Sequence, residues 1–209
     1  MKKVLLVVVM CLLFVVPVAS AQVEIRSSDG QRSVTVFDDG RLIYQSANGT
    51  LNVQVTKTGL RVGDLSIEGT EVEKTATGLK MRLSVKKGAA ATSDVVEVNN
   101  ANATVHGANA QLRKMLKEFA KSSDGYLLNE ARELIVQNLE TGRVKGNGAG
   151  SVSSEWSTYG CGQDLLNAVA AGGAMVAGCA AGGWWCVSGV SWYGSSLIQL
   201  STGGECVFM

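Results

Sequence analysis

The sequence Gly-Cys-Ala-Ala-Gly-Gly-Trp-Trp-Cys, residues 178–186, lies inside a segment without a formal charge, residues 165–204. These 40 residues exceed one helical membrane span, which takes about 20 residues, and match two spans joined by a turn. Gly182 and Gly183 stand where that turn is needed, because glycine adopts turn conformations without steric cost. We therefore predict a C-terminal apolar helical hairpin with arms at residues 165–181 and 184–200.

Four cysteines belong to this module: Cys161, Cys179, Cys186 and Cys206. In two antiparallel helices, facing residues have a nearly constant sum of residue numbers. This condition holds for Cys179 with Cys186 at the tip and for Cys161 with Cys206 at the open end. Joining Cys161 to Cys179 would instead bridge ~27 Å of helix, although a disulfide needs Cα atoms within about 7 Å. If the arms are helical, the sequence predicts two nested disulfides. A zinc site is the alternative, but zinc ligands usually include close Cys-x-x-Cys pairs.

Small and aromatic residues in the hairpin favour contact with lipid. Gly178 and Gly182 form a GxxxG pattern, and Gly173, Ala177 and Ala181 continue the small residues, which lets helices touch where lipid gives no hydrophobic drive. The residues assigned to membrane contact are Gly178, Gly182, Gly183, Trp184, Trp185 and Trp192. Two alternatives stay open: a buried hairpin in a soluble domain, or glycine-rich strands in the second arm.

The N-terminal residues predict export. Lys2 and Lys3 precede an apolar run that ends at Ala19-Ser20-Ala21, the arrangement of a secretory signal peptide cleaved after Ala21. The run is shorter than a membrane span, so an uncleaved anchor is the weaker interpretation. Export places the chain in an oxidising compartment, where disulfides form. We expect a secreted protein that loses Cys11 with its signal, residues 1–21.

Between the signal and residue 141, two periodicities predict an α+β fold. Apolar residues alternate with polar ones over residues 23–106, with Gly, Asn and Asp between the runs, which indicates an antiparallel β meander with one buried face. The Asp38-Asp39-Gly40 sequence predicts a hairpin turn, and its carboxylates are interpreted as solvated turn residues. From Asn109 the spacing becomes helical, and two amphipathic helices are predicted, separated by residues 122–125 and ending at Thr141-Gly142.

A glycine-rich polar stretch then marks the domain boundary. Residues 142–160 are predicted to be a flexible linker between a carrier or protective domain (residues 22–141) and the peptide module (residues 161–209). Arg143 and Lys145 are the last two basic residues of the chain, so they are the predicted recognition site of a processing protease.

Composition and motifs argue against several other functions. Basic residues do not cluster as a nucleic-acid binder requires, and no nucleotide-binding loop occurs. The single histidine, His106, suggests a Cys–His hydrolase with Cys161, but the other cysteines offer Cys161 a disulfide partner. We therefore expect no enzyme activity, no cofactor and no metal.

Residues 178–186 resemble the Cys-Ala-Ala-Gly-Gly-aromatic segment of halocin-type bacteriocins, although this chain has fewer cysteines. The layout is also similar to that of secreted sporulation-delaying toxins. The resemblance implies a secreted precursor whose C-terminal antimicrobial peptide acts on the lipid membranes of competing cells and self-associates there. Residues 22 to about 145 would serve as carrier, chaperone or self-protecting domain. The alternative is a non-toxic envelope protein whose β-rich domain binds a partner.

Overall fold

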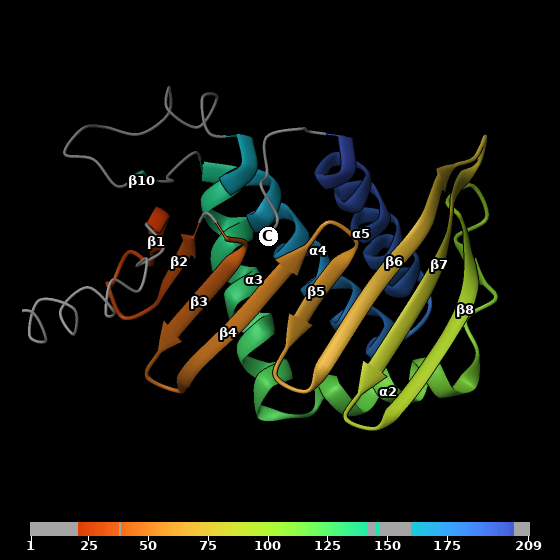
Figure 1. Ribbon diagram of the computed structural model, residues 1–209, viewed down its shortest axis with the longest axis horizontal. Helices are drawn as coiled ribbons and strands as arrows, with labels where there is room; N and C mark the ends of the chain where they lie inside the picture. The colour runs from red at the N-terminus through yellow and green to blue at the C-terminus, as the bar shows by residue number, and fades with distance from the viewer. Residues whose placement is uncertain (1–20, 38, 142–144, 147–159, 203–209) are drawn as a thin grey trace, which may run out of the picture.

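The computed structural model describes residues 21–37, 39–141, 145–146 and 160–202. Its centre is a ten-stranded antiparallel sheet in which β1 to β9 follow the order of the chain and β10 pairs with β1 at one edge (Figure 1). The strands are β1 (Ala21–Arg26), β2 (Ser33–Phe37), β3 (Arg41–Ser46), β4 (Gly49–Thr56), β5 (Gly59–Val62), β6 (Leu65–Lys74), β7 (Gly78–Lys87), β8 (Ala90–Asn99), β9 (Thr104–His106) and β10 (Lys145–Gly146). The predicted β meander is confirmed.

The alternation of side chains gives the sheet one apolar face. In β7, Leu79, Met81, Leu83 and Val85 are buried, and the residues between them are not. The other long strands repeat this period of two, because successive side chains point to opposite faces of a sheet. One face is therefore polar, and the other needs an apolar cover.

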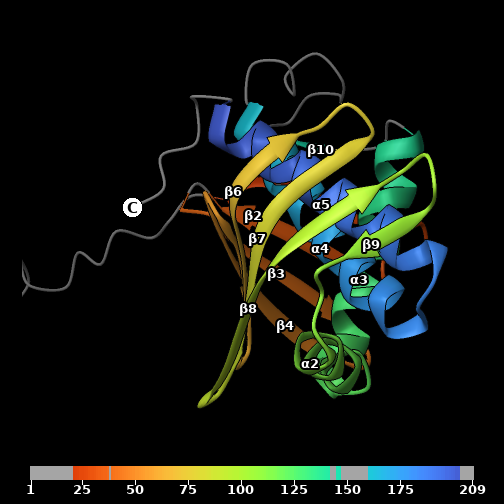
Figure 2. The ribbon, with the colours of Figure 1, turned by 90° about the vertical axis from the view of Figure 1, so that its right-hand side faces the viewer.

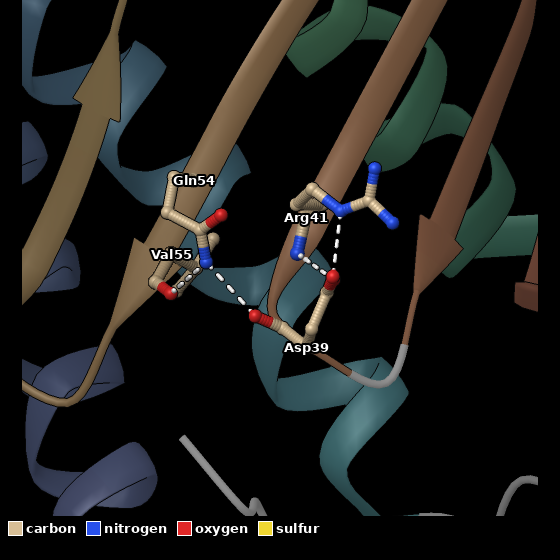
Figure 3. A network of polar contacts seen from close by, with 4 residues as sticks. All are labelled: Asp39, Arg41, Gln54 and Val55. Carbon is tan, nitrogen blue, oxygen red and sulfur yellow. Dashed lines mark hydrogen bonds and ion pairs between the residues drawn. The ribbon is translucent and has the colours of Figure 1, made fainter. Parts of the chain in front are cut away.

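The β2–β3 turn is held by backbone and side-chain contacts of Asp39 (Figure 3). The Asp39 carboxylate accepts hydrogen bonds from the Arg41 backbone N–H (3.0 Å) and from Arg41 Nε (2.6 Å). Gln54 Nε2 donates to the backbone oxygens of Asp39 (2.9 Å) and Val55 (3.2 Å). Gly40 has a φ of +80°, a conformation that L side chains rarely adopt. Asp39 thus has the turn role that the sequence indicated, and Asp38 lies outside the described residues.

Two amphipathic helices follow the sheet, as predicted. Asn109 caps α2 (Ala110–Ala120), because its side chain accepts a hydrogen bond from the Leu112 N–H at 2.7 Å. Helix α3 (Ser123–Thr141) begins inside the predicted interruption at residues 122–125. The reason is that the Ser122 hydroxyl accepts a hydrogen bond from the Gly125 N–H at 3.1 Å, which lets a helix start at once. The break between the helices is therefore shorter than expected.

Helices α4 (Gly160–Ala181) and α5 (Trp184–Thr202) form the predicted helical hairpin. Gly182 (φ +86°) and Gly183 (φ +62°) make the turn between them. The helices approach closely at two glycines: a Cβ on Gly178 would meet the Trp185 carbonyl, and a Cβ on Gly189 would lie 2.7 Å from the Ala174 carbonyl oxygen. The predicted contact through Gly178 and Gly182 is thus only half right, since Gly182 lies in the turn.

The four helices of the described residues, α2 to α5, cover the same face of the sheet (Figure 2). Buried apolar side chains from the sheet, from α2 and α3 and from the hairpin form one continuous cluster. The sheet with α2 and α3, predicted to be a separate domain, and the hairpin therefore share one hydrophobic core. Lys145 lies in β10, where it pairs with Glu24, so part of the predicted linker completes the sheet edge. Arg143, Trp156 and the predicted signal peptide apart from Ala21 fall outside the described residues.

The contact at Gly178 can be tested with Gly178→Ala. On helix propensity alone, alanine would stabilise the chain by about 1 kcal/mol. Because the new methyl group would collide with backbone atoms of α5, we expect a net loss of about 2 kcal/mol in the free energy of unfolding, measured by guanidinium denaturation. Ser188→Ala, at an exposed position of α5, is the control and should change stability by less than about 0.5 kcal/mol. A more stable Gly178→Ala chain would contradict the close approach.

Candidate functional site

The candidate site is the hairpin and the surface that holds it. Helix α4 packs on α2 and α3 and reaches β2, β4 and β5, whereas α5 lies over β6 to β9. Figure 1 shows both helices behind the sheet, with α4 nearer to β4 and α5 nearer to β6. We call the apolar face of the sheet together with α2 and α3 the cradle.

Glycines on both partners receive leucine side chains from the other. A Cβ on Gly172 of α4 would collide with Leu60 of β5, and a Cβ on Gly194 of α5 would collide with Leu79 of β7. The reverse contact places Leu197 of α5 against Gly69 of β6. A Cβ at any of these glycines would require the facing leucine side chain to shift, and packed interiors have few voids to receive it. The hairpin is thus fitted to this sheet at three defined points.

Tyr193 provides a buried polar link between hairpin and sheet. Its hydroxyl donates a 2.9 Å hydrogen bond to the Ile67 carbonyl oxygen of β6, and the side chain is fully buried. Burial disfavours the phenolate, which raises the pKa of Tyr193 above its ordinary value. A second, longer link runs from Asn100 Nδ2 to Ser191 Oγ at 3.4 Å.

The tip of the hairpin combines a covalent closure with exposed aromatic side chains. Cys179 and Cys186 form the predicted tip disulfide, with Cα atoms 4.1 Å apart. Trp184 and Trp185, directly after the turn, are 53% and 68% exposed. Trp192 is different, because it is partly buried and packs against the core. Of the tryptophans predicted to contact membranes, only Trp184 and Trp185 are thus presented to solvent in this fold.

Two clefts flank the tip. One, of about 290 Å³, lies between the first turns of α3 and the last turns of α4 and includes Tyr126 and Ala180 in its lining. The other, of about 300 Å³, lies beside the disulfide and includes His106, Arg113, Gly182 and Gly183. Its lining also contains Thr104, whose buried hydroxyl has no hydrogen-bond partner among the described residues. The single histidine therefore lies beside the tip.

This position separates His106 from Cys161. Cys161 is in the first turn of α4, whereas His106 lines the cleft at the opposite end of that helix. About 27 Å of helix lie between Cys161 and Cys179 at a rise of 1.5 Å per residue, so the fold does not bring a Cys–His pair together. Within the described ranges, three or more His, Cys, Asp or Glu side chains do not converge as a metal site would require. Cys206 lies outside these ranges, so the Cys161–Cys206 disulfide stays a prediction.

Comparison with known proteins found no matching protein family, curated protein or solved structure. By length and composition, one helical segment of the described chain could cross a membrane: Gly162–Ala181, with a mean hydropathy of 1.4 and 56% of the tested window buried in this fold. A core helix of a soluble protein passes the same test, so this segment alone does not distinguish between the two environments.

The sequence predicted the hairpin, its turn and the tip disulfide, but it did not predict that α4 and α5 pack against the apolar face of the sheet. The glycine content of the tail was attributed to helix contact in lipid, whereas Gly172 and Gly194 receive side chains from the sheet. The spacing of glycines in the tail does not predict which leucine packs against each of them. The Tyr193 link leaves no local signal in the sequence, because its acceptor is a backbone carbonyl 126 residues away.

The Tyr193 link predicts a pH dependence of stability. The unfolded tyrosine ionises near pH 10, whereas the buried tyrosine keeps its proton at higher pH. The stabilisation is therefore complete below about pH 10 and is lost as pH rises above it, because the unfolded state then binds fewer protons. Tyr193→Phe should cost about 1–2 kcal/mol at pH 7 by leaving the Ile67 carbonyl unpaired. Denaturation curves from pH 7 to 11 should show the two chains converging at high pH, and parallel curves would contradict the role assigned to Tyr193.

The tip disulfide predicts a second stability change. In the chain-entropy model a bridge across so short a loop contributes about 2 kcal/mol, so Cys179→Ser with Cys186→Ser should lower the free energy of unfolding by that amount. Non-reducing peptide mapping should recover Cys179 linked to Cys186, leaving Cys161 with Cys206. Recovery of Cys161 linked to Cys179 would overturn the helical hairpin, because α4 separates these residues.

Proposed function

We propose that this chain is the secreted precursor of a membrane-active, disulfide-bonded antimicrobial peptide, with the hairpin as the peptide and the cradle as its carrier. The observation that supports this most directly is the nature of the hairpin. It is an apolar unit with no charged residue in positions 165–204, closed at its tip by its own disulfide and stored against the rest of the chain.

The hairpin has the properties of a structural unit that could separate from the cradle as one piece after a backbone cut. Helix α4 packs more extensively on α5 than on any other element. A cut outside the hairpin leaves its two arms joined by the backbone turn, and the tip disulfide holds that turn closed. A single cut among residues 142–160 would therefore free one hairpin and leave the cradle as a separate chain.

The cradle explains how such a peptide could be made without harm to the producing cell. Leu165, Leu166, Val169 and Met175 of α4 are fully buried beneath the sheet, α2 and α3. Large apolar surfaces are seldom left exposed on soluble proteins, because they associate or bind membranes. With its apolar face covered, the hairpin of the intact chain is shielded from lipid except at its tip, and residues 22–141 act as a protective carrier.

Release requires an apolar destination. Burying a large aliphatic side chain contributes about 1.5–3 kcal/mol each, so transfer of the freed hairpin from the cradle to water would be strongly unfavourable. A lipid bilayer replaces the apolar surroundings that the hairpin loses on leaving the cradle. The proposal therefore places transfer at the membrane of the target cell, after cleavage by a processing protease.

An envelope protein with no peptide release is the alternative, and the shared core favours it. One hydrophobic cluster includes both the sheet and the hairpin, as expected of a domain that functions whole. The two functions differ in the mass of the protein in spent medium. A fragment beginning between residues 143 and 161 favours the peptide, and an intact mature chain favours the envelope protein.

Controlled cleavage tests the proposed release. A recognition site for a specific protease is inserted between residues 147 and 159, and the oxidised chain is added to dye-loaded liposomes. We expect little leakage before cleavage and at least a tenfold faster rate after it. The matched control has the same site in the β7–β8 turn at Gly88, which is exposed and away from the hairpin.

Cleavage at Gly88 should not produce leakage, because both new ends stay in the sheet. Equal leakage by the intact and the cleaved chain would contradict shielding by the cradle. Leakage by neither form, with the freed hairpin recovered by mass spectrometry, would contradict the membrane-active peptide.

A further inference from the structure

Three large apolar side chains are exposed in the described part of the chain, and all three lie around one end of α4. Trp184 and Trp185 follow the tip turn, and Tyr126 lines the neighbouring cleft together with Ala180. Tryptophan and tyrosine have an apolar body and a polar group, and they are enriched where hydrocarbon meets water at membrane surfaces. The tip thus exposes aromatic side chains although the rest of the hairpin is covered.

Helix α2 places basic side chains beside this tip. Its apolar residues, including Leu112 and Phe119, are buried in the core. Its outward face carries the exposed residues Arg113, Lys114, Lys117 and Lys121. Arg113 and the turn glycines Gly182 and Gly183 line the same cleft, so α2 and the tip are neighbours.

Most of this positive charge is not neutralised by the protein. Lys114 pairs with Glu118 at 3.8 Å, and ion pairs of Arg113, Lys117 or Lys121 do not occur within the described residues. The hairpin has no basic residue of its own, because Lys145 is the last one in the chain. A surface that combines aromatic and cationic groups therefore arises only where the hairpin and α2 meet.

We propose that the intact, uncleaved chain docks on anionic lipid membranes through this composite surface, defined as Trp184, Trp185, Arg113, Lys117 and Lys121. The two tryptophans enter the interface, and the cations lie against lipid phosphates. The remainder of the hairpin stays in the cradle. Docking would thus hold the precursor at a membrane before any cut, and it does not depend on the proposed release.

The charge of the composite surface indicates whether its partner is a lipid membrane or a second copy of the chain. In a symmetric dimer joined through Trp184 and Trp185, the basic faces of the two α2 helices would lie near each other and repel. An anionic bilayer instead pairs with the same charges, at about 1 kcal/mol for each Lys or Arg near the surface. The observed charges therefore favour lipid as the occupant.

The test uses the full mature chain with vesicles of phosphatidylcholine alone or mixed with phosphatidylglycerol. Trp156→Phe and Trp192→Phe are introduced first, so that emission reports on Trp184 and Trp185. We expect a blue shift and co-sedimentation with anionic vesicles only, without dye leakage, and with the chain intact by mass. Arg113→Gln, Lys117→Gln and Lys121→Gln together should lower the partition coefficient roughly a hundredfold.

The matched control removes three exposed positive charges from the sheet instead, with Lys57→Gln, Arg61→Gln and Lys74→Gln. Because these residues are not on α2, this variant should bind at least ten times more tightly than the α2 variant. Trp184→Ala with Trp185→Ala should also weaken binding while keeping the unfolding transition of the parent chain.

Three results would overturn the proposal: equal binding of the two charge variants, equal binding to neutral vesicles, or a dimer that is lost in the tryptophan double variant without any vesicle binding. Failure of the freed hairpin to cause leakage would not affect docking by the uncut chain. The two proposals therefore fail separately.

Discussion

The structure depends on the fit between glycines and leucines where the hairpin meets the sheet. Leu60 and Leu79 occupy the space above Gly172 and Gly194, and Leu197 occupies the space above Gly69. These contacts bring helix backbone close to sheet side chains, so dispersion and burial act along the sheet-facing sides of α4 and α5. Without the hairpin, much of the apolar face of the sheet would be exposed to water. The meander and the tail therefore complete each other's core.

This shared core goes with an uneven distribution of charge: residues 165–204 carry no formal charge, and the rest of the chain carries the basic residues. The hairpin can do without charge because it packs in the apolar cradle. The basic residues all lie in the rest of the chain, at or before Lys145. At the tip, α2 brings that charge beside Trp184 and Trp185. Basic and aromatic residues that lie far apart in the sequence are thus neighbours on one surface of the fold.

The tip disulfide and the Tyr193 hydrogen bond stabilise different contacts of the hairpin. The bond between Cys179 and Cys186 fixes one arm to the other and lies entirely within the hairpin. The hydrogen bond from Tyr193 to Ile67 exists only while the hairpin lies on the sheet, because its acceptor belongs to β6. The disulfide is thus internal to the hairpin, whereas the Tyr193 hydrogen bond joins the hairpin to the sheet.

The sequence by itself determined the strands, the helices, the hairpin turn and the Cys179–Cys186 pair. Each follows from local periodicity, from glycine at a turn, or from the geometry of two antiparallel helices. Only the tertiary structure decided that the hairpin lies in the core of the sheet, that Gly172 and Gly194 face leucines of the sheet, and that Lys145 belongs to a strand. These features rest on partners far apart in the chain. A glycine has the same local signal whether a neighbouring helix, a lipid tail or Leu79 fills the space above it.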